Sequence, residues 1–287
     1  MSDRSARFEA MGTSGFVELE GGRIYFEVDG EGHPLLLIHG GLGSLRMWDG
    51  QVPAFSERYR VIRYDTRGFG RTQTDDVAFV NLDDAVAVLD HVEARSAYVV
   101  GQSRGASIAL DLTIAHPDRV DALVSVAGGI GGYEVRRPPD VIAVFEELDH
   151  LWDAEEWSAL AELETRLWVD GWGQPAGRID GELRRTVFGW IEANYRAEKV
   201  EGKPQALDPP AAERLDEVRV PTMVMIGEVD EAGGVEAERH LAASVAGAQV
   251  VAFPGVAHMI HLEEPDRFNQ LVLEFLAGAA DRRETPG

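Results

Sequence analysis

The stretch "VVGQSRGASIAL" (residues 99–110) decides the fold. It passes from an apolar segment into a helical pattern, and Ser103 lies at the junction between Gly101 and Gly105. A strand that turns directly into a helix forces the residue at the joint into a strained geometry, and the two glycines remove side chains that would collide. The pattern predicts a Ser103 hydroxyl above the carboxyl edge of a sheet, where ligands bind in open α/β folds. The alternative is that Ser103 only caps the helix.

The segments on both sides of this stretch alternate between strand and helix patterns. Strands are expected over residues 15–22, 23–30, 33–41, 59–72, 97–103, 120–129, 220–230 and 248–258. Helices are expected over residues 81–96, with Asn81 as cap, and over 103–119, 235–245 and 264–280. This alternation predicts an α/β protein with a mostly parallel, eight-stranded sheet flanked by helices.

The alternation stops after "GGIGGYEVRRPPD" (128–140), and only helical segments follow until about Lys203. Five of the six tryptophans lie there: Trp152, Trp157, Trp168, Trp172 and Trp190. We expect a helical cap over 133–211, inserted into a core formed by 14–132 and 212–281. Its tryptophans are expected both to pack the cap on the core and to form an apolar lid over Ser103.

Composition excludes several classes of protein. Lys and Arg number 27 against 50 Asp and Glu, giving a net charge of −23, and such a surface repels phosphate backbones and anionic lipid. We therefore expect neither a nucleic-acid nor a membrane partner. The sequence contains no cysteine, which removes thiol nucleophiles and disulfides and favours a cytoplasmic location. The polar N-terminal segment lacks a signal core, and no segment approaches the roughly 18 apolar residues of a membrane span.

A serine hydroxyl needs a base to remove its proton, and His258 is the best candidate. It follows the last expected strand at its carboxyl end, where a loop can bring the ring to Ser103. His261 is the second candidate base and is otherwise expected on the pocket wall. The remaining histidines are expected in surface, packing or loop positions: His33, His39, His91, His116, His150 and His240.

An imidazole base needs a carboxylate to fix its tautomer. The segment "GEVDEAG" ends the preceding strand and offers Glu228, Asp230 and Glu231. Asp230 is chosen because it lies just past the strand end, whereas Glu231 is expected to be a solvated loop acid. The expected strand over 120–129 ends without a carboxylate, which favours Asp230 further.

Backbone N–H groups in a small-residue loop can stabilise the oxyanion of a tetrahedral intermediate. The loop "HGGLGS" (39–44) follows a buried strand and contains three glycines. The expected donors are the N–H of Gly41, with Leu42 as second choice, and the N–H of Arg104. The alternative is a plain turn.

Taken together, these segments resemble the α/β-hydrolase superfamily, in particular its cap-domain esterase and lactonase-like branch, which includes 3-oxoadipate enol-lactonases. The matching segments are the glycine loop, "YDTRGFGRT" (64–72), "GQSRG" (101–105), "GEVD" (227–230) and "PGVAHMIHLEEP" (254–265). The order Ser103, Asp230, His258 is also that of the family. The resemblance implies a structural turn at Asp65 and Arg67, and it implies no metal or organic cofactor. Arg104 and Ala106 depart from the usual pattern, and the Arg104 side chain is expected either to reach the pocket or to form an ion pair.

We therefore expect a serine hydrolase that cleaves a carboxylic ester or lactone through an acyl-enzyme. Leu42, Trp168, Trp172 and His261 are expected to contact this small-molecule substrate, and the protein is expected to be a monomer or homodimer. Hydrolysis of carbon–carbon bonds or amides on the same scaffold is one alternative, because a fold does not choose its chemistry. A non-catalytic small-molecule receptor is an alternative of another class.

Overall fold

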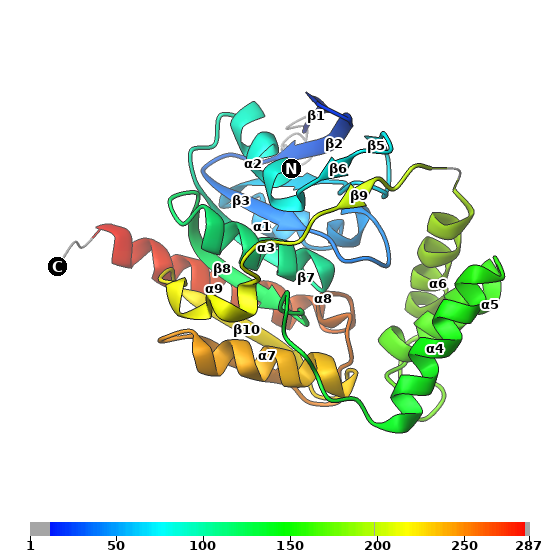
Figure 1. The fold of residues 1–287 in the computed structure, drawn as a ribbon. Coiled ribbons are helices and arrows are strands. Elements are labelled where there is room, and N and C mark those ends of the chain that lie inside the picture. The colour runs from blue at the N-terminus through cyan, green and yellow to red at the C-terminus, as the bar shows by residue number, and fades with distance from the viewer. Residues whose placement is uncertain (1–11, 198, 285–287) are drawn as a thin grey trace, which may run out of the picture.

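The computed structural model describes residues 12–197 and 199–284, which are built around one central sheet (Figure 1). Its strands follow the order β1-β2-β4-β3-β7-β8-β10-β11, and the short β5 pairs with β2. The strands are β1 (Thr13–Leu19), β2 (Gly22–Asp29), β3 (His33–Ile38), β4 (Tyr59–Tyr64), β5 (Gln73–Thr74), β7 (Ala97–Gln102), β8 (Val120–Val126), β10 (Thr222–Gly227) and β11 (Gln249–Phe253). A separate two-stranded sheet pairs β6 (Ala78–Phe79) with β9 (Lys203–Pro204).

Strand direction confirms the predicted sheet. The path from β4 to β11 is parallel throughout, and β1, β2 and β5 are attached by antiparallel pairing. β1 and β2 form a hairpin that turns at Gly21, which has a φ of +74° that other residues rarely adopt. Because the strands from β4 to β11 run the same way, their carboxyl ends share one edge of the sheet.

Burial on both faces of the sheet explains why the sequences of these strands are continuous apolar runs. In β3, Leu36 and Ile38 pack on one face of the sheet, and Leu35 and Leu37 pack on the other, since successive side chains of a strand point to opposite faces. Each such side chain contributes roughly 1.5–3 kcal/mol when fully buried. Both faces must therefore be covered by helices.

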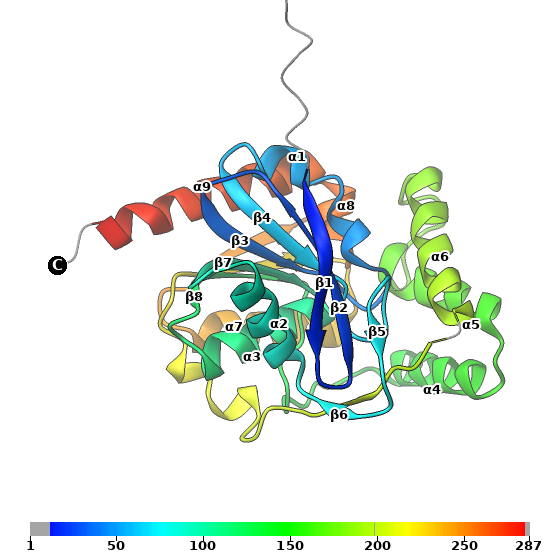
Figure 2. The same ribbon diagram turned by 90° about the horizontal axis from the view of Figure 1, so that it is seen from above.

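Two layers of helices supply that cover (Figure 2). One layer contains α2 (Asn81–His91), α3 (Arg104–Ala115) and α7 (Ala232–Ser244), and the other contains α1 (Val52–Phe55) and α9 (Pro265–Glu284). Shorter helical elements lie in the segments between the strands and the longer helices: η1 (Leu45–Trp48), η3 (Ala211–Glu213), η4 (Leu215–Glu217) and α8 (Ile260–Glu263). None of the helices within residues 12–197 and 199–284 combines the length and hydrophobicity needed to cross a membrane.

The cap helices, defined as α4 (Pro139–Asp153), α5 (Trp157–Glu164) and α6 (Gly181–Arg196), stand apart from both layers (Figures 1 and 2). A π-helical turn, η2 (Thr165–Val169), continues α5. A small apolar cluster joins these helices to the core: Leu42, Met47, Ala161, Val169, Val187, Ile191 and Met259. Leu42 and Met259 follow the carboxyl ends of β3 and β11, so the cluster holds the cap helices at the edge where those strands end. The boundaries 133 and 211 stay a prediction.

Candidate active site

Ser103 occupies the sharp joint that its motif predicts. β7 ends at Gln102 and α3 begins at Arg104, and Ser103 between them has φ +54° and ψ −120°, a region that residues other than glycine rarely adopt. A Cβ at Gly101 would collide with the carbonyl of Gly105, which confirms the steric reason for the first glycine. The Ser103 side chain accepts no bond from the N–H groups of its helix. The capping alternative is therefore wrong, and the hydroxyl is available for other chemistry.

His258 and Asp230 form a buried pair. Nδ1 of His258 lies 2.7 Å from Oδ2 of Asp230, and the two side chains are 8% and 3% exposed. The other carboxylate oxygen of Asp230 accepts a bond from the backbone N–H of Glu231 (2.7 Å). A carboxylate at Nδ1 fixes the tautomer that carries its proton there, so Nε2 is left as the basic nitrogen.

Several contacts hold the loop that carries His258. Gln102, the residue before Ser103, donates from Nε2 to the His258 carbonyl (3.1 Å), and the His258 N–H donates to the Trp168 carbonyl (3.2 Å). Glu263 accepts the neighbouring Ala257 N–H (3.0 Å) and pairs with Arg178 between the cap helices. The histidine is therefore tied to the serine turn and to the cap region at once.

Ser103 and His258 line one cavity of about 640 Å³. The indole of Trp168 forms another part of its wall, with its ring centroid 4.7 Å from that of His258. Among the hydrogen bonds of the described residues, none joins Ser103 to His258. Catalytic hydrogen bonds are often long before substrate binds and tighten in the complex. The predicted nucleophile and base therefore line the same cavity, although no hydrogen bond among the described residues joins them.

The glycine loop lies beside the serine. A Cβ at Gly40 would come within 3.2 Å of the Ser103 Cβ, whereas a Cβ at Gly41 would meet no atom within 4 Å. Open space therefore adjoins the predicted donor Gly41. The Leu42 side chain is buried in the apolar cluster with the cap helices, and it is not among the described residues that line the Ser103 cavity.

His39 fixes the orientation of this loop. Burial lowers its pKa to about 3, so the ring is neutral. Nδ1 donates to the carbonyl of Gly40 (2.7 Å), and Nε2 accepts the Thr66 N–H (3.0 Å). The carbonyl of Gly40 and the N–H of Gly41 belong to one planar trans peptide and point in opposite directions. By holding the carbonyl, His39 turns the Gly41 N–H the other way.

The side chain of Arg104 completes this network. Nη1 donates to Thr66 Oγ1 (2.5 Å), which lies 3.2 Å from Nε2 of His39. Nη2 donates to Asn81 Oδ1 (2.9 Å). Asn81 therefore does not cap its helix as expected; Val80 holds the position before the helix. Arg104 lines the cavity, in agreement with the expectation that it reaches the pocket. The alternative expectation was an ion pair, and no carboxylate of the described residues lies within ion-pairing distance of Arg104.

Besides Leu42, two more of the predicted contact residues lie away from the Ser103 cavity. The indole N–H of Trp172 donates to Asp140 (3.0 Å) in a different cavity within the cap region. His261 is completely buried against Trp48, with ring centroids 4.7 Å apart, and burial lowers its pKa to about 3. The structure therefore places neither side chain at Ser103, and it leaves His261 out of reach as a base.

Glu231 corrects another expectation. It is 1% exposed rather than solvated, and its carboxylate accepts the N–H groups of Gly233 (2.8 Å) and Gly234 (3.1 Å) at the start of α7. Arg137 Nε lies 3.4 Å from the same carboxylate. Glu231 thus caps a helix directly beside the catalytic candidate Asp230.

Asp65 and Arg67 hold a structural turn as predicted. Asp65 accepts the Leu45 N–H, and Arg67 pairs with the Asp84 carboxylate.

Sequence reasoning missed Gln102, Arg137 and Glu238. Glu238 of α7 accepts the Ser125 hydroxyl (2.8 Å) and the Gly128 N–H at the end of β8, and burial raises its pKa to about 8. The sequence signal for Glu238 was a charged residue on the apolar side of the α7 pattern.

Among the described residues, no group of three or more His, Cys, Asp or Glu is placed to hold a metal ion.

Comparison with known proteins agrees with this geometry. Residues 33–265 match the model of the alpha/beta hydrolase fold family. The chain belongs to that family. It is a hydrolase, and its fold is that of the esterase and lactonase-like branch that the motifs indicated.

Three similar proteins differ in the chemistry that their names state. A 2-hydroxymuconate semialdehyde hydrolase of Pseudomonas sp. (strain CF600) is 30% identical over 87% of this chain and 89% of its own length. The carbamate hydrolase RutD of Caulobacter sp. (strain K31), a function that its name gives as provisional, is 28% identical over 90% and 97%. The solved structure of Est816, described as degrading N-acyl homoserine lactones, is 26% identical over 91% and 100%, with a TM-score of 0.69.

Proposed function

We propose that this hydrolase cleaves a carboxylic ester or lactone through an acyl-enzyme formed on Ser103. The observation that carries the proposal is the joint between β7 and α3, which holds the Ser103 hydroxyl in a cavity shared with a histidine whose other nitrogen binds a buried carboxylate. Nucleophile, base and orienting acid are the three parts of a serine hydrolase.

The first step forms the acyl-enzyme. Substrate binding brings the Ser103 hydroxyl to Nε2 of His258, which removes the proton as the oxygen attacks the carbonyl carbon. Asp230 stabilises the imidazolium through the 2.7 Å contact to Nδ1. The imidazolium then gives its proton to the leaving alcohol. In the second step His258 takes a proton from water, which attacks the acyl group. The imidazolium then returns that proton to the Ser103 oxygen as the bond to the acyl group breaks and the acid leaves.

The N–H groups of Gly41 and Arg104 stabilise the oxyanion in both steps. A chain of hydrogen bonds runs from the Arg104 guanidinium through Thr66 and His39 to the Gly40 carbonyl. Arg104, at one end of this chain, supplies one oxyanion donor with its own backbone N–H. His39, at the other end, orients the peptide whose N–H, that of Gly41, is the second donor. Donors fixed before reaction cost no reorganisation in the transition state, and one such donor is worth about 3–4 kcal/mol.

An ester or lactone is favoured because the cavity offers a nucleophile and an indole wall for an apolar acyl or alcohol group. Est816, the structural relative at 26% identity, acts on a lactone by its description. Arg137 adds a cation to the same wall.

The test compares Ser103→Ala with Ser107→Ala in the hydrolysis of p-nitrophenyl butyrate. Ser103→Ala is expected to lower kcat by at least about 10⁴-fold with an unchanged thermal melt. Ser107 lines the same cavity, but its hydroxyl donates to the Gly129 carbonyl (3.0 Å), so Ser107→Ala is expected to retain hydrolysis. Turnover retained by Ser103→Ala would contradict the proposal.

Carbon–carbon bond hydrolysis is the second candidate, and one comparison favours it specifically. The substrate named for the Pseudomonas relative contains no ester, so the shared scaffold carries chemistry of another kind there. A parallel screen of esters, lactones and β-diketones separates the two candidates, with Ser103→Ala as the control. Turnover of β-diketones alone, lost in Ser103→Ala, would replace the ester proposal and retain the nucleophile.

A further inference from the structure

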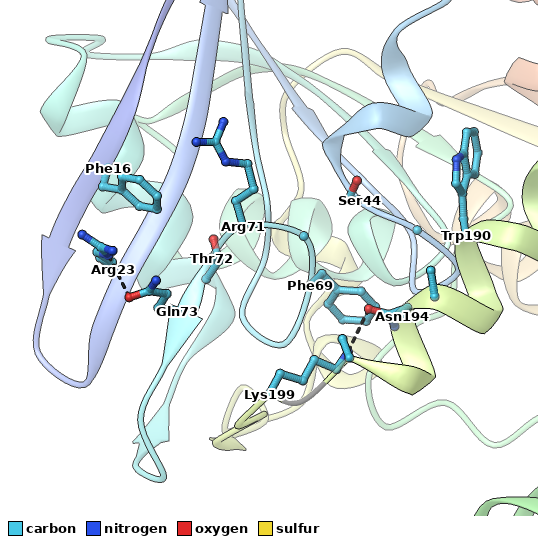
Figure 3. A pocket seen from close by; sticks show the side chains of 14 residues that line it. Phe16, Arg23, Ser44, Phe69, Arg71, Thr72, Gln73, Trp190, Asn194 and Lys199 are labelled. Atoms are coloured by element: carbon cyan, nitrogen blue, oxygen red, sulfur yellow. Dashed lines mark hydrogen bonds between the residues drawn. The ribbon is translucent and has the colours of Figure 1, made fainter. Parts of the chain in front are cut away.

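A second cavity, of about 770 Å³, is lined by Gly43 and Ser44 at the end of the glycine loop (Figure 3). Arg23 and Phe16 line it from the β1–β2 hairpin, and Trp190, Asn194 and Lys199 line it from α6 and the chain that follows. Among the described residues, the two cavities have no lining residue in common. A ligand held here would bridge the core and the cap without occupying the catalytic cavity.

Among the residues that the structure describes, the charged side chains that line this cavity are all cations: Arg23, Arg71 and Lys199. The chain as a whole carries a net charge of −23, so three cations around one cavity stand out against their surroundings. Figure 3 shows Arg23 and Arg71 beside the strands and Lys199 on the opposite side, below Phe69. The three cations therefore line the cavity from separate segments of the chain.

Both arginines are oriented by contacts that leave donors available. The Arg71 guanidinium stacks on the ring of Tyr25 at 3.9 Å, and the Arg23 guanidinium stacks on Phe16 at 4.4 Å. Arg23 uses Nε to donate to Gln73 (2.9 Å). In the described part of the chain neither arginine forms an ion pair. A stacked guanidinium keeps its plane fixed and its N–H edge free, which suits a planar carboxylate.

Lys199 is held mainly by neutral oxygens. Its ammonium donates to the Gly68 carbonyl and to Asn194 Oδ1 (2.8 Å), and the nearest carboxylate oxygen, on Glu201, is 3.7 Å away. The ammonium also lies 4.9 Å from the centroid of Phe69, whose ring is 5.0 Å from the Arg104 guanidinium. Two cations therefore lie close to the Phe69 ring, and an anion in the cavity would relieve their repulsion.

Aromatic side chains complete the wall and define the shape of the ligand. Phe16, Phe69 and Trp190 line the cavity between the cationic groups, and Figure 3 shows the three rings distributed around it. Such rings favour a flat apolar body by stacking or edge contacts. The side-chain amides of Gln73 and Asn194 add polar groups that can orient a carboxylate.

We propose that this cavity is a binding site for a small organic anion, a carboxylate on a flat apolar body, which contacts Arg23 and Arg71 and packs against the aromatic side chains of the wall. The site is separate from the catalytic cavity. The proposal stands whether or not Ser103 is a nucleophile, because binding here uses none of the catalytic side chains.

The test is isothermal titration of the full chain with 2-naphthoate as the probe. The double variant Arg23→Gln/Arg71→Gln is expected to weaken binding by about tenfold or more. The matched control is Arg95→Gln/Arg239→Gln, which removes the same two charges from exposed positions elsewhere and is expected to bind as the wild type does. The neutral 2-naphthamide is expected to bind far more weakly, and added salt is expected to weaken naphthoate binding.

Four outcomes would overturn the proposal. They are the absence of naphthoate binding to the wild type, equal affinities of the wild type and the Arg23/Arg71 variant, equal binding of naphthoate and naphthamide, and loss of binding in Trp168→Ala instead. The last outcome would place the probe in the catalytic cavity. If the double variant does not fold, Arg71→Gln alone gives the same test, because Arg71 is exposed and its guanidinium stacks on the Tyr25 ring without an ion pair in the described part of the chain.

Discussion

The carboxyl edge of the sheet and the cap helices build one cavity in different ways. At the edge, Ser103, Asp230 and His258 sit in the turns that follow β7, β10 and β11, and backbone bonds hold those turns. The cap contributes Trp168, whereas Trp172 four residues later faces a different cavity. In the proposed mechanism the reacting groups therefore lie in the turns at the sheet edge, and the cap supplies part of the cavity wall. Changes at the edge should affect kcat, and changes in the cap should affect KM.

The largest effect is expected at the acid of the edge. Asp230→Asn leaves the shape intact but favours the wrong histidine tautomer, so kcat should fall by about 10⁴-fold. Glu231→Gln changes the neighbouring buried carboxylate in the same way, and kcat should stay near the wild-type value because Glu231 serves the start of α7. Steady-state kinetics with a p-nitrophenyl ester measure both. Equal losses of kcat in the two variants would show that Asp230 has no catalytic role beyond that of its neighbour Glu231.

Arg104→Met should have the next largest effect. It removes the guanidinium that holds Thr66 and, through it, His39, while the backbone N–H of residue 104 remains. We expect kcat to fall by about 10- to 100-fold with little change in KM, because the loss concerns oxyanion stabilisation. Arg104→Lys should recover part of the loss. A variant with raised KM and unchanged kcat would instead make Arg104 a substrate-binding residue.

These edge residues are also those that the sequence indicated best. Strand direction follows from the alternation of elements, and parallel strands bring Ser103, Asp230 and His258 to one edge regardless of side-chain packing. By contrast, the direction of a cap side chain depends on the tertiary partner of its helix. That is why Trp172 was expected at the substrate, and why the pairing of Arg137 with Glu231 was missed.

His261 shows the same limit on a smaller scale. It lies three residues after His258 and reads as part of the same loop, yet α8 begins at Ile260 and turns the ring into the core. The sequence favoured His258 as the base, but no pattern of residue types showed that the His261 ring lies in the core rather than on the pocket wall. The distinction comes from Trp48 and Phe268, which receive the His261 ring.

The two cap tryptophans allow a smaller test of the comparison. Trp168→Ala removes the ring against His258 but keeps the backbone carbonyl that accepts the His258 N–H. We expect KM for an aromatic ester to rise about tenfold, equivalent to about 1.4 kcal/mol of binding, with a smaller change in kcat. Trp172→Ala is the matched control, and its KM should not change. If both variants raise KM equally, the cap acts as a whole.

Glu238 gives the smallest effect on activity and a distinct effect on stability. Burial raises its pKa to about 8 from an ordinary value of 4.5, so between those values the folded state keeps a proton that the unfolded state releases. The free energy of unfolding should therefore fall as pH rises through this window, by an amount on the order of a few kcal/mol. Glu238→Gln resembles the protonated acid and should lack this loss. Urea unfolding at pH 5, 6.5 and 8 checks the difference, and parallel profiles would contradict it.

Covalent labelling tests the central claim most directly. The wild-type chain is treated with a fluorophosphonate, and the labelled peptide is identified by mass spectrometry, with ester turnover followed in the same sample. We predict one adduct per chain, located on Ser103, and loss of turnover in proportion to labelling. An adduct on another serine, or full turnover after Ser103 is labelled, would contradict the account.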